Sequence, residues 1–234
     1  MFKKLLFLML VFVVGGAGGL FLPVLIGRWW PDAPLLPQNQ TVIVNRTEQV
    51  VLAEKEALER AYRMVAPALV TVRASKSGGV QASGNGFVVS SDGFVLTRTE
   101  WVGEAFGIVV EHSAGEAPAR VVKMSDQYGL ALLKVDASNL PVVSFAGDVP
   151  QRIGTTAFLL GVKRGASGRT LFVNSGIIKS VDGRLIETTI EEEFAPATGT
   201  PLVAADGSVM GINSVNSTGR VFAISSDAIK EFLQ

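Results

Sequence analysis

Few side chains in this sequence could carry out acid–base or nucleophilic chemistry. His112 is the only histidine and there is no cysteine, so thiolate chemistry and disulfides are excluded, and a hydroxyl nucleophile would have a single imidazole to activate it. His112 directly follows the strand-like run Val109–Glu111, a position that favours capping an exposed hairpin over acting as a base. One histidine and scattered carboxylates make no recognisable set of metal ligands. We therefore expect no metal and no cofactor.

The elements that must position any such group are short strands. The chain has 234 residues, of which 48% are hydrophobic and 25 are glycine. This length can bury one sizeable core, and glycine-rich turns between valine-rich runs are typical of an all-β protein in which helix is the minority. We expect one compact module.

Twelve strand-like runs follow Pro67 in two successive sets. The runs of the first set are 69–74, 86–90, 94–97, 107–111, 119–124 and 130–135. The runs of the second set are 156–162, 171–180, 185–190, 201–204, 209–213 and 220–224. They would form one barrel over about 66–138 and another over about 150–225, and residues 226–234 would add a closing helix. A double β-barrel and a single β-sandwich both fit this periodicity.

The N-terminal 30 residues predict a membrane anchor. Leu5 to Gly27 is an uncharged stretch of roughly 23 residues, or ~35 Å as a helix, which can cross a bilayer core. Lys3 and Lys4 precede it, which favours a cytoplasmic N-terminus and a single-pass topology with the following domain extracytoplasmic. A cleaved signal peptide is the alternative, and it exports the domain equally.

Residues 31–52 are expected to form an extended linker and an edge strand. Three prolines between Pro31 and Pro37 exclude a packed helix there, and Thr41 to Leu52 alternates like a strand. From Ala53 onward apolar residues recur at helical spacing until Pro67, which predicts a short amphipathic helix.

Charge argues against one class of partner. Formal net charge is zero, and because three of the 21 basic residues precede Pro31, the remainder is slightly acidic. No basic surface interleaved with aromatic residues is apparent, so we expect no nucleic-acid binding.

Five segments carry a family resemblance. Gly84–Thr97, G-N-G-F-V-V-S-S-D-G-F-V-L-T, resembles the G-S-G-F-I-I-S-x-D-G-Y-I-L-T opening of the trypsin-like HtrA/DegP serine proteases. The other four segments are similar to later motifs of the same family: Leu130–Val135, Gly147–Gly154, Asn174–Ser180 and Pro201–Asn213. The resemblance covers Val65 to the C-terminus.

The resemblance implies a chymotrypsin/trypsin-like double β-barrel over residues 53–234, with a peptide-binding cleft. Many family members continue into a PDZ domain, and this sequence ends without one. Relatives that are membrane-anchored resemble trimers, so a homotrimer or a hetero-oligomer with active homologues is implied. Peptides or unfolded proteins are the implied ligands, in the periplasm or at the cell surface, within envelope protein quality control.

At the positions that match the family's catalytic motifs, every required residue is replaced. Glu100 stands in the place of the histidine, and glutamate is a weaker base than imidazole near neutral pH. Gly129 stands in the place of the aspartate and can orient nothing, while Asp126, three residues earlier, is interpreted as part of a turn. Thr198 replaces the serine nucleophile. Pro196 replaces a glycine whose N–H helps to bind the oxyanion, and proline has no N–H.

The sequence therefore predicts an inactive protease homologue that binds peptides or partner proteins. In the family, the strand that matches Ser214, Val215 and Asn216 pairs with substrate through its backbone, and this requires no triad. Those three residues and Thr198 are the candidate peptide-binding positions. Two alternatives stay open: a hydrolase that uses Thr198 with Glu100 or a histidine from another subunit, and a structural subunit that assembles with active homologues.

Overall fold

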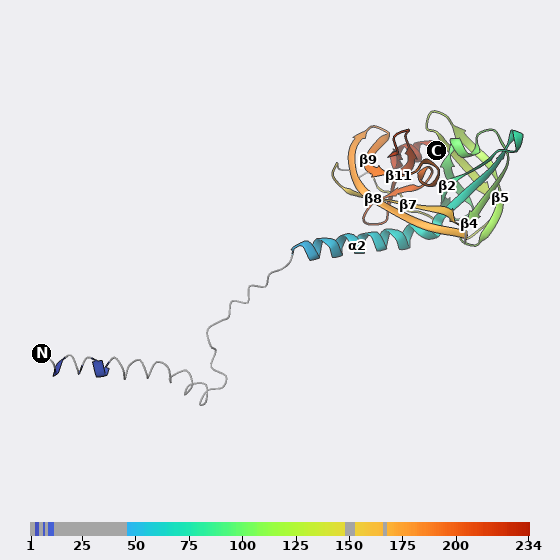
Figure 1. Ribbon diagram of the computed structural model, residues 1–234. Coiled ribbons are helices and arrows are strands. Elements are labelled where there is room, and N and C mark those ends of the chain that lie inside the picture. Colours follow the sequence, from blue (N-terminus) through green and yellow to red (C-terminus); the bar gives the residue numbers. More distant parts are fainter. Residues whose placement is uncertain (1–2, 5–6, 8, 12–45, 148–152, 166–167) are drawn as a thin grey trace. The chain divides into compact units, whose positions relative to one another are not determined.

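The computed structural model describes residues 3–4, 7, 9–11, 46–147, 153–165 and 168–234 (Figure 1). Side chains are not described for 46–53 and 164–165. Most of the expected anchor, 1–30, and the first part of the expected linker lie outside the described residues. No helix within the described part of the chain combines the length and the hydrophobicity needed to cross a membrane.

Six antiparallel strands close the first barrel in the order β1-β2-β3-β6-β5-β4. They are β1 (Leu69–Lys76), β2 (Gln81–Ser90), β3 (Phe94–Arg98), β4 (Ala105–His112), β5 (Gly115–Ser125) and β6 (Leu130–Val135). The β2–β3 hairpin turns at Asp92–Gly93, where Gly93 has φ +103°.

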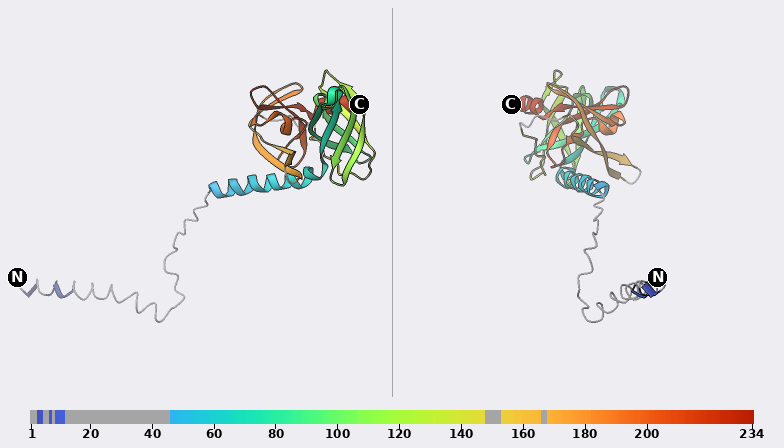
Figure 2. Two further views of the ribbon diagram at one scale, coloured as in Figure 1. Left: turned by 45° about the vertical axis from the view of Figure 1, so that its right-hand side comes forward. Right: turned by 90° about the vertical axis from the view of Figure 1, so that its left-hand side faces the viewer.

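The second barrel repeats the arrangement in the order β10-β11-β12-β9-β8-β7. Its strands are β7 (Thr156–Gly165), β8 (Gly168–Asp182), β9 (Leu185–Glu191), β10 (Pro201–Val203), β11 (Val209–Val215) and β12 (Arg220–Ser225). Figure 2 shows the two barrels side by side. The predicted all-β double barrel is therefore confirmed, and the β-sandwich is excluded.

Two apolar cores support these barrels. One cluster fills the first barrel and extends into the contact between the barrels, where Phe87 and Phe158 are both fully buried. A separate cluster around Ile186 and Leu202 fills the second barrel. Residues from both barrels contribute to the candidate site.

Four short helical segments and two longer helices complete the described structure of residues 46–234. The short segments are α3 (Thr99–Val102), α4 (Phe194–Ala197) and the 3-10 turns η1 (Ala66–Ala68) and η2 (Ser77–Gly79). The helix α5 (Ser226–Leu233) agrees with the expected closing helix, and Ser225 caps it by accepting the Ala228 N–H at 3.3 Å.

The edge strand predicted up to Leu52 is wrong for the described residues 46–52. They belong to α2 (Arg46–Val65), a helix of 20 residues that is longer than the predicted one. The sequence after Ala53 is rich in Ala, Glu and Leu, which have high helix propensity, and Glu59 pairs with both Lys55 and Arg63 one turn away. A helix once nucleated extends at low cost, so this segment overrides the weaker alternation before it.

Candidate functional site

Glu100, at the family's histidine position, lies on α3 directly after β3. Its carboxylate Oε1 is 3.2 Å from a terminal nitrogen of Arg98. The Arg98 side chain is only 8% exposed, and its other terminal nitrogen donates to the carbonyl of Tyr128 at 3.2 Å. The carboxylate is thus held in an ion pair with a buried guanidinium.

Gly129, at the aspartate position, lies in a turn with φ +62°. Its N–H donates to the carbonyl of Asp126 at 3.2 Å, which confirms that Asp126 belongs to the turn. A Cβ built on Gly129 would fall 2.7 Å from an Arg98 terminal nitrogen. The space that a side chain at this position would need is therefore occupied by a cation.

Thr198, at the nucleophile position, follows α4 and is completely buried. Its hydroxyl has no hydrogen-bond partner among the described residues. Its carbonyl accepts hydrogen bonds from the indole of Trp101 at 3.2 Å and from the Asn85 N–H at 3.3 Å. The hydroxyl therefore has neither a base beside it nor access to solvent.

Both backbone donors of an oxyanion hole are missing. Pro196 has no N–H, and the Thr198 N–H donates instead to the carbonyl of Phe194 at 2.9 Å. This second bond closes α4, the helical turn that leads to Thr198. The sequence revealed the loss at Pro196, whereas the loss at Thr198 depends on the helical conformation and had no signal in the sequence.

Trp101 covers the buried threonine from α3. Its indole is 7% exposed, and a Cβ built on Gly84 would overlap it at 2.0 Å, so glycine is required there. On the other side, the ring of Phe194 on α4 lies with its centroid 5.6 Å from that of Trp101. One large side chain thus connects the segment that carries Glu100 with the segment that carries Thr198, and its volume occupies the space between them.

Asn85 joins the two barrels at the same point. Its amide nitrogen donates to the Pro196 carbonyl at 2.8 Å, and its amide oxygen accepts the Val162 N–H of β7 at 3.1 Å. Its own carbonyl accepts the Thr97 hydroxyl at 2.7 Å. The residue is 2% exposed. It replaces the serine of the family's G-S-G-F motif, and that substitution was the only signal in the sequence for its role.

Two of the three candidate strand residues are buried. Ser214 and Val215 on β11 are 3% and 5% exposed. Asn216 is exposed, but its side-chain oxygen caps the β11–β12 turn by accepting hydrogen bonds from the Thr218 N–H, the Thr218 hydroxyl and the Arg220 N–H. The three residues thus lie together at the end of β11, and the side chain of Asn216 stabilises the turn that follows.

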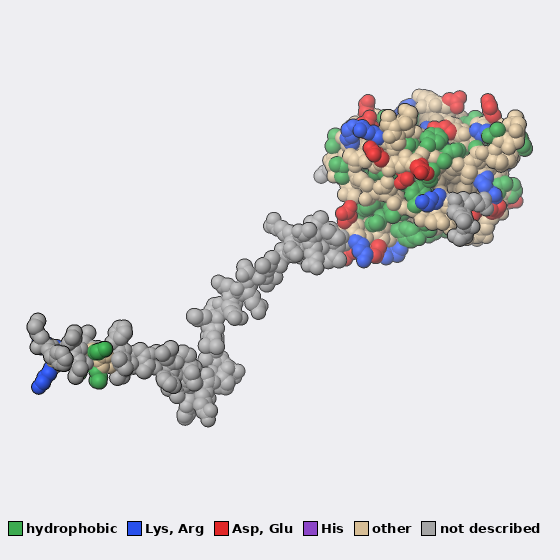
Figure 3. All heavy atoms as spheres, viewed as in Figure 1, with side chains coloured by type: hydrophobic (Ala, Val, Ile, Leu, Met, Phe, Trp, Pro, Cys, Tyr) green, Lys and Arg blue, Asp and Glu red, His purple; other side chains and the backbone are tan. Residues whose placement is uncertain are grey.

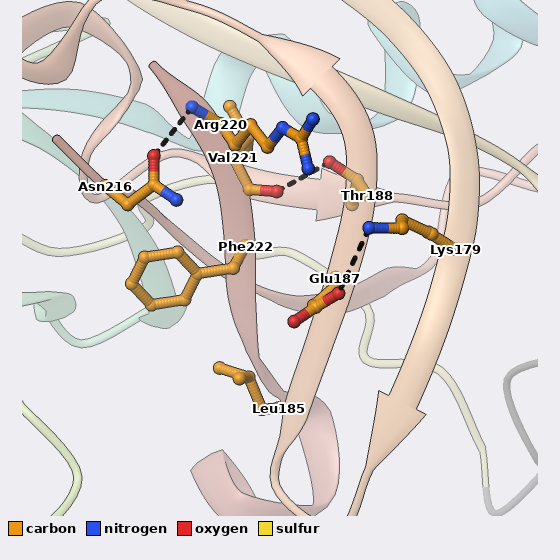
Figure 4. Close-up of a pocket in the computed structure, with 8 residues that line it drawn as sticks. All are labelled: Lys179, Leu185, Glu187, Thr188, Asn216, Arg220, Val221 and Phe222. Carbon is orange, nitrogen blue, oxygen red and sulfur yellow. Dashed lines mark hydrogen bonds and ion pairs between the residues drawn. The ribbon is translucent and has the colours of Figure 1, made fainter. Parts of the chain in front are cut away.

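Asn216 also borders a hollow of about 320 Å³ on the second barrel, in which Phe222 and Leu185 supply apolar surface and an ion pair joins Lys179 to Glu187 at 3.8 Å (Figure 4). Neither Thr198 nor Glu100 lines this hollow. It is therefore distinct from the degenerate catalytic positions.

A groove of about 310 Å³ lies beside the degenerate oxyanion position. Both barrels and α4 contribute to it, and its lining residues are Thr71, Ser83, Gly84, Asn85, Val162, Lys163, Glu193, Ala195 and Pro196. The groove carries one cation and one anion, Lys163 and Glu193, and otherwise presents small and backbone groups. Such a surface can bind a peptide through its main chain, and it contains no nucleophile paired with a base.

His112, the single histidine, lies at the end of β4 opposite Gly115 in the β4–β5 hairpin. Its Nδ1 accepts the Ala114 N–H at 3.2 Å. This hydrogen bond confirms the predicted role of His112 in the hairpin. His112 makes no hydrogen bond to the Thr198 hydroxyl, which has no partner in the described part of the chain.

Comparison with known proteins defines the class. The chain belongs to the trypsin-like peptidase domain family, whose model matches residues 84–212. Its relatives within that family are of the HtrA/DegP type. A probable periplasmic DegP-like serine endoprotease of Pseudomonas putida is 32% identical over 151 residues, which cover 61% of this chain and 31% of that protein. The matched region thus spans about a third of the relative's length.

Solved structures agree. The serine endoprotease of Yersinia pestis superposes with a TM-score of 0.64 at 29% identity, covering 75% of this chain and 64% of that one. The structure of the HtrA-type protease AlgW with a tripeptide gives a TM-score of 0.66 at 26% identity, covering 75% of this chain and 62% of that one.

Proposed function

We propose that this chain is a catalytically inactive HtrA-type homologue that binds peptides or partner proteins without cleaving them. One observation carries the proposal: the Thr198 N–H is bonded to Phe194, and Pro196 has no N–H. A tetrahedral intermediate formed at Thr198 would find neither of the two donors that stabilise its oxyanion. Loss of a single donor costs about 3–4 kcal/mol of transition-state stabilisation.

The chemistry of proton transfer supports the same conclusion. A hydroxyl nucleophile needs a base within about 3 Å, and the base needs an orienting partner. Here the Thr198 hydroxyl has no partner in the described structure, and Glu100 is paired with Arg98. We infer that the buried hydroxyl is a packing group.

Binding is supported by the groove beside Pro196. It lies open between the barrels, at the location where Asn85 holds α4 against β7. A similar HtrA-type protease, AlgW, has a solved structure with a tripeptide. We propose an extended peptide as ligand here, with Lys163 and Glu193 meeting its charged groups. Thr198 and Val215 are both buried and do not line this groove.

We further propose that residues 5–27 anchor the protein and that the double barrel is extracytoplasmic. The apolar length of this segment and the lysines before it support the topology, and a related protein is named as periplasmic. Protease accessibility of the barrels in spheroplasts tests it: digestion only after lysis would contradict an extracytoplasmic domain.

Catalytic inactivity is tested with a fluorophosphonate label and a casein hydrolysis assay on the full-length chain in mild detergent. We expect no label and no hydrolysis, and the same result for Thr198→Ala. The Pseudomonas putida relative serves as the positive control. Labelling that disappears in Thr198→Ala would overturn the proposal in favour of a threonine hydrolase.

Peptide binding is tested on the same preparation with fluorescent fragments of unfolded casein. We expect Lys163→Glu, in the groove, to weaken binding of acidic fragments by about tenfold, the equivalent of one charge-assisted contact. Lys179→Glu, on the other hollow, is the matched control and should leave the affinity unchanged. Equal affinities for all three proteins would remove the groove as the binding site.

A further inference from the structure

The long strand β8 is paired on both sides over only part of its length. It contains fifteen residues. Residues 168–177 pair with β7, whereas pairing with β9 is confined to Ile178–Asp182. Beyond Thr188 the backbone of β9 pairs with β12 through Glu191, and only side chains still join it to β8, such as the Asn174 amide, which donates to the Glu191 carbonyl at 3.0 Å. The first half of β8 therefore has one edge without a partner strand among the described residues.

The hydrogen bonds at the end of this segment indicate which backbone groups face the open edge. The Ile178 N–H donates to the Thr155 carbonyl beside β7 at 2.9 Å. The Ile177 N–H points the other way and donates to the Thr189 hydroxyl of β9 at 3.0 Å. Because backbone groups alternate sides along an antiparallel strand, the even-numbered residues of β8 face β7 and the odd-numbered residues face the open edge.

Three odd-numbered residues offer unpaired backbone groups there. The Ser175 N–H is already taken by the Asn174 side chain at 2.8 Å, which leaves Arg169, Leu171 and Val173. Leu171 and Val173 also expose apolar side chains, at 39% and 45%. Figure 3 shows that hydrophobic side chains reach the surface on one face of the barrels. An open edge with apolar flanks is a template for an added strand.

Two residues of this segment, Arg169 and Leu171, line a groove. It has a volume of about 420 Å³, and its lining residues are Tyr62, Arg63, Ala66, Pro67, Ser113, Arg169 and Leu171. The end of α2 and the η1 turn thus form the wall opposite β8. An extended chain placed in this groove would have β8 on one side and the α2 end on the other.

Arg169 gives the groove a chemical preference. It is half-buried, and one terminal nitrogen donates to the Leu69 carbonyl. Its Nε is buried without a hydrogen-bond partner among the described residues. Burial lowers the pKa of this guanidinium, and the negative charge of Glu111 opposes that shift. Arg63 brings a second cation to the same groove. A carboxylate would supply a counter-ion.

We propose that the open edge of β8 is a second peptide site, which adds an extended segment antiparallel to Arg169–Val173 and places a carboxylate beside Arg169. Antiparallel addition brings the C-terminal end of the peptide to Arg169, because β8 runs away from that residue. The carboxylate comes either from the peptide's C-terminus or from an acidic side chain near it. This site is separate from the groove at Pro196, and it does not depend on whether the protein is inactive.

The test uses the full-length chain in mild detergent and fluorescent octapeptides of alternating valine and threonine. One peptide ends in a free carboxylate, the second in an amide, and the third in an amide preceded by glutamate. We expect one or both carboxylate peptides to bind about tenfold more tightly than the plain amide, as measured by anisotropy. The peptide that gains identifies the source of the carboxylate.

Two variants address the site. Val173→Pro removes an N–H that faces the open edge and leaves the bonds to β7 intact, and Arg169→Gln removes the cation. We expect each to weaken binding about tenfold, and Arg169→Gln to abolish the preference for a carboxylate. Val122→Pro, a bulge residue of β5 with the same 45% exposure, and Arg120→Gln are the matched controls.

Hydrogen exchange on the unmodified chain tests the site independently, even if Val173→Pro does not fold. The Leu171 and Val173 amides should exchange faster than those of Phe172 and Asn174, and should slow when peptide is added. The proposal is overturned if none of the three peptides binds, if the controls weaken binding as much as the site variants, or if exchange slows elsewhere only.

Discussion

A terminal nitrogen of Arg98 lies 2.7 Å from the place where a side chain at Gly129 would begin. In HtrA-type proteases the matching position carries the aspartate that orients the catalytic histidine. Here a cation occupies that space and pairs with Glu100 at 3.2 Å. Arg98 therefore fills the space beside Gly129 and holds Glu100 in an ion pair. The Thr198 hydroxyl has no hydrogen bond to either position among the described residues.

Rebuilding the triad should fail to restore hydrolysis. In a variant with Glu100→His, Gly129→Asp and Thr198→Ser, the new aspartate would meet Arg98 rather than the histidine, and Pro196 would still provide no oxyanion donor. We expect activity on casein at least about 100-fold below that of the Pseudomonas putida relative, because one missing donor alone costs that much. Activity comparable with the relative would contradict this account.

Trp101 should contribute strongly to stability and keep Thr198 buried. Trp101→Ala removes an indole that is 7% exposed, and should lower the free energy of unfolding by about 3–5 kcal/mol. Trp101→Phe keeps most of the packing but loses the hydrogen bond to the Thr198 carbonyl, and should cost about 1 kcal/mol plus a small loss of packing. Urea unfolding measures both. Equal losses for the two variants would indicate that packing contributes little.

The double barrel could be predicted from the sequence because strand periodicity and turn dipeptides such as Asp92–Gly93 are local signals. The four replaced positions could be identified from the sequence because Glu100, Gly129, Pro196 and Thr198 stand within motifs of the family. The geometry of these residues could not be predicted from the sequence.

The contact of Trp101 with Thr198 joins residues 97 positions apart, and that of Asn85 with Pro196 joins residues 111 apart. No local pattern encodes such pairs. Asn85 replaces a serine in the first motif, but this substitution did not indicate that Asn85 connects the two barrels. The missed start of α2 has a different cause, since helix propensity after Ala53 extends a helix backward over an alternating segment.

Asn85 should be a main connection between the barrels. Asn85→Ala leaves the Val162 N–H and the Pro196 carbonyl without their partner, and buried groups without a partner cost about 1–3 kcal/mol each. We expect the free energy of unfolding to fall by about 2–4 kcal/mol.

Asn216→Ala is the matched control for Asn85→Ala. It removes three hydrogen bonds from an exposed turn, where water replaces them, and should cost only about 1 kcal/mol. If Asn216→Ala proved the more damaging of the two in urea unfolding, the assignment of Asn85 as the connection between the barrels would fail.

Asp206 lies in the β10–β11 turn and should make the free energy of unfolding depend on pH. Hydrogen bonds from the Ser208 hydroxyl and N–H, at 2.7 and 2.9 Å, lower the pKa of the Asp206 carboxyl. Because the pKa in the folded state lies below the unfolded value of about 3.9, the contribution is present above that value and is lost as pH falls through the folded pKa. The variant Asp206→Asn keeps an acceptor oxygen but does not titrate. We expect the native protein to be more stable than Asp206→Asn by about 0.5 kcal/mol at pH 7, a small value because solvent screens an exposed carboxylate. This difference in the free energy of unfolding should disappear as pH falls below about 4. A gap of the same size at pH 3 and pH 7 in urea unfolding would show that the charge of Asp206 does not contribute.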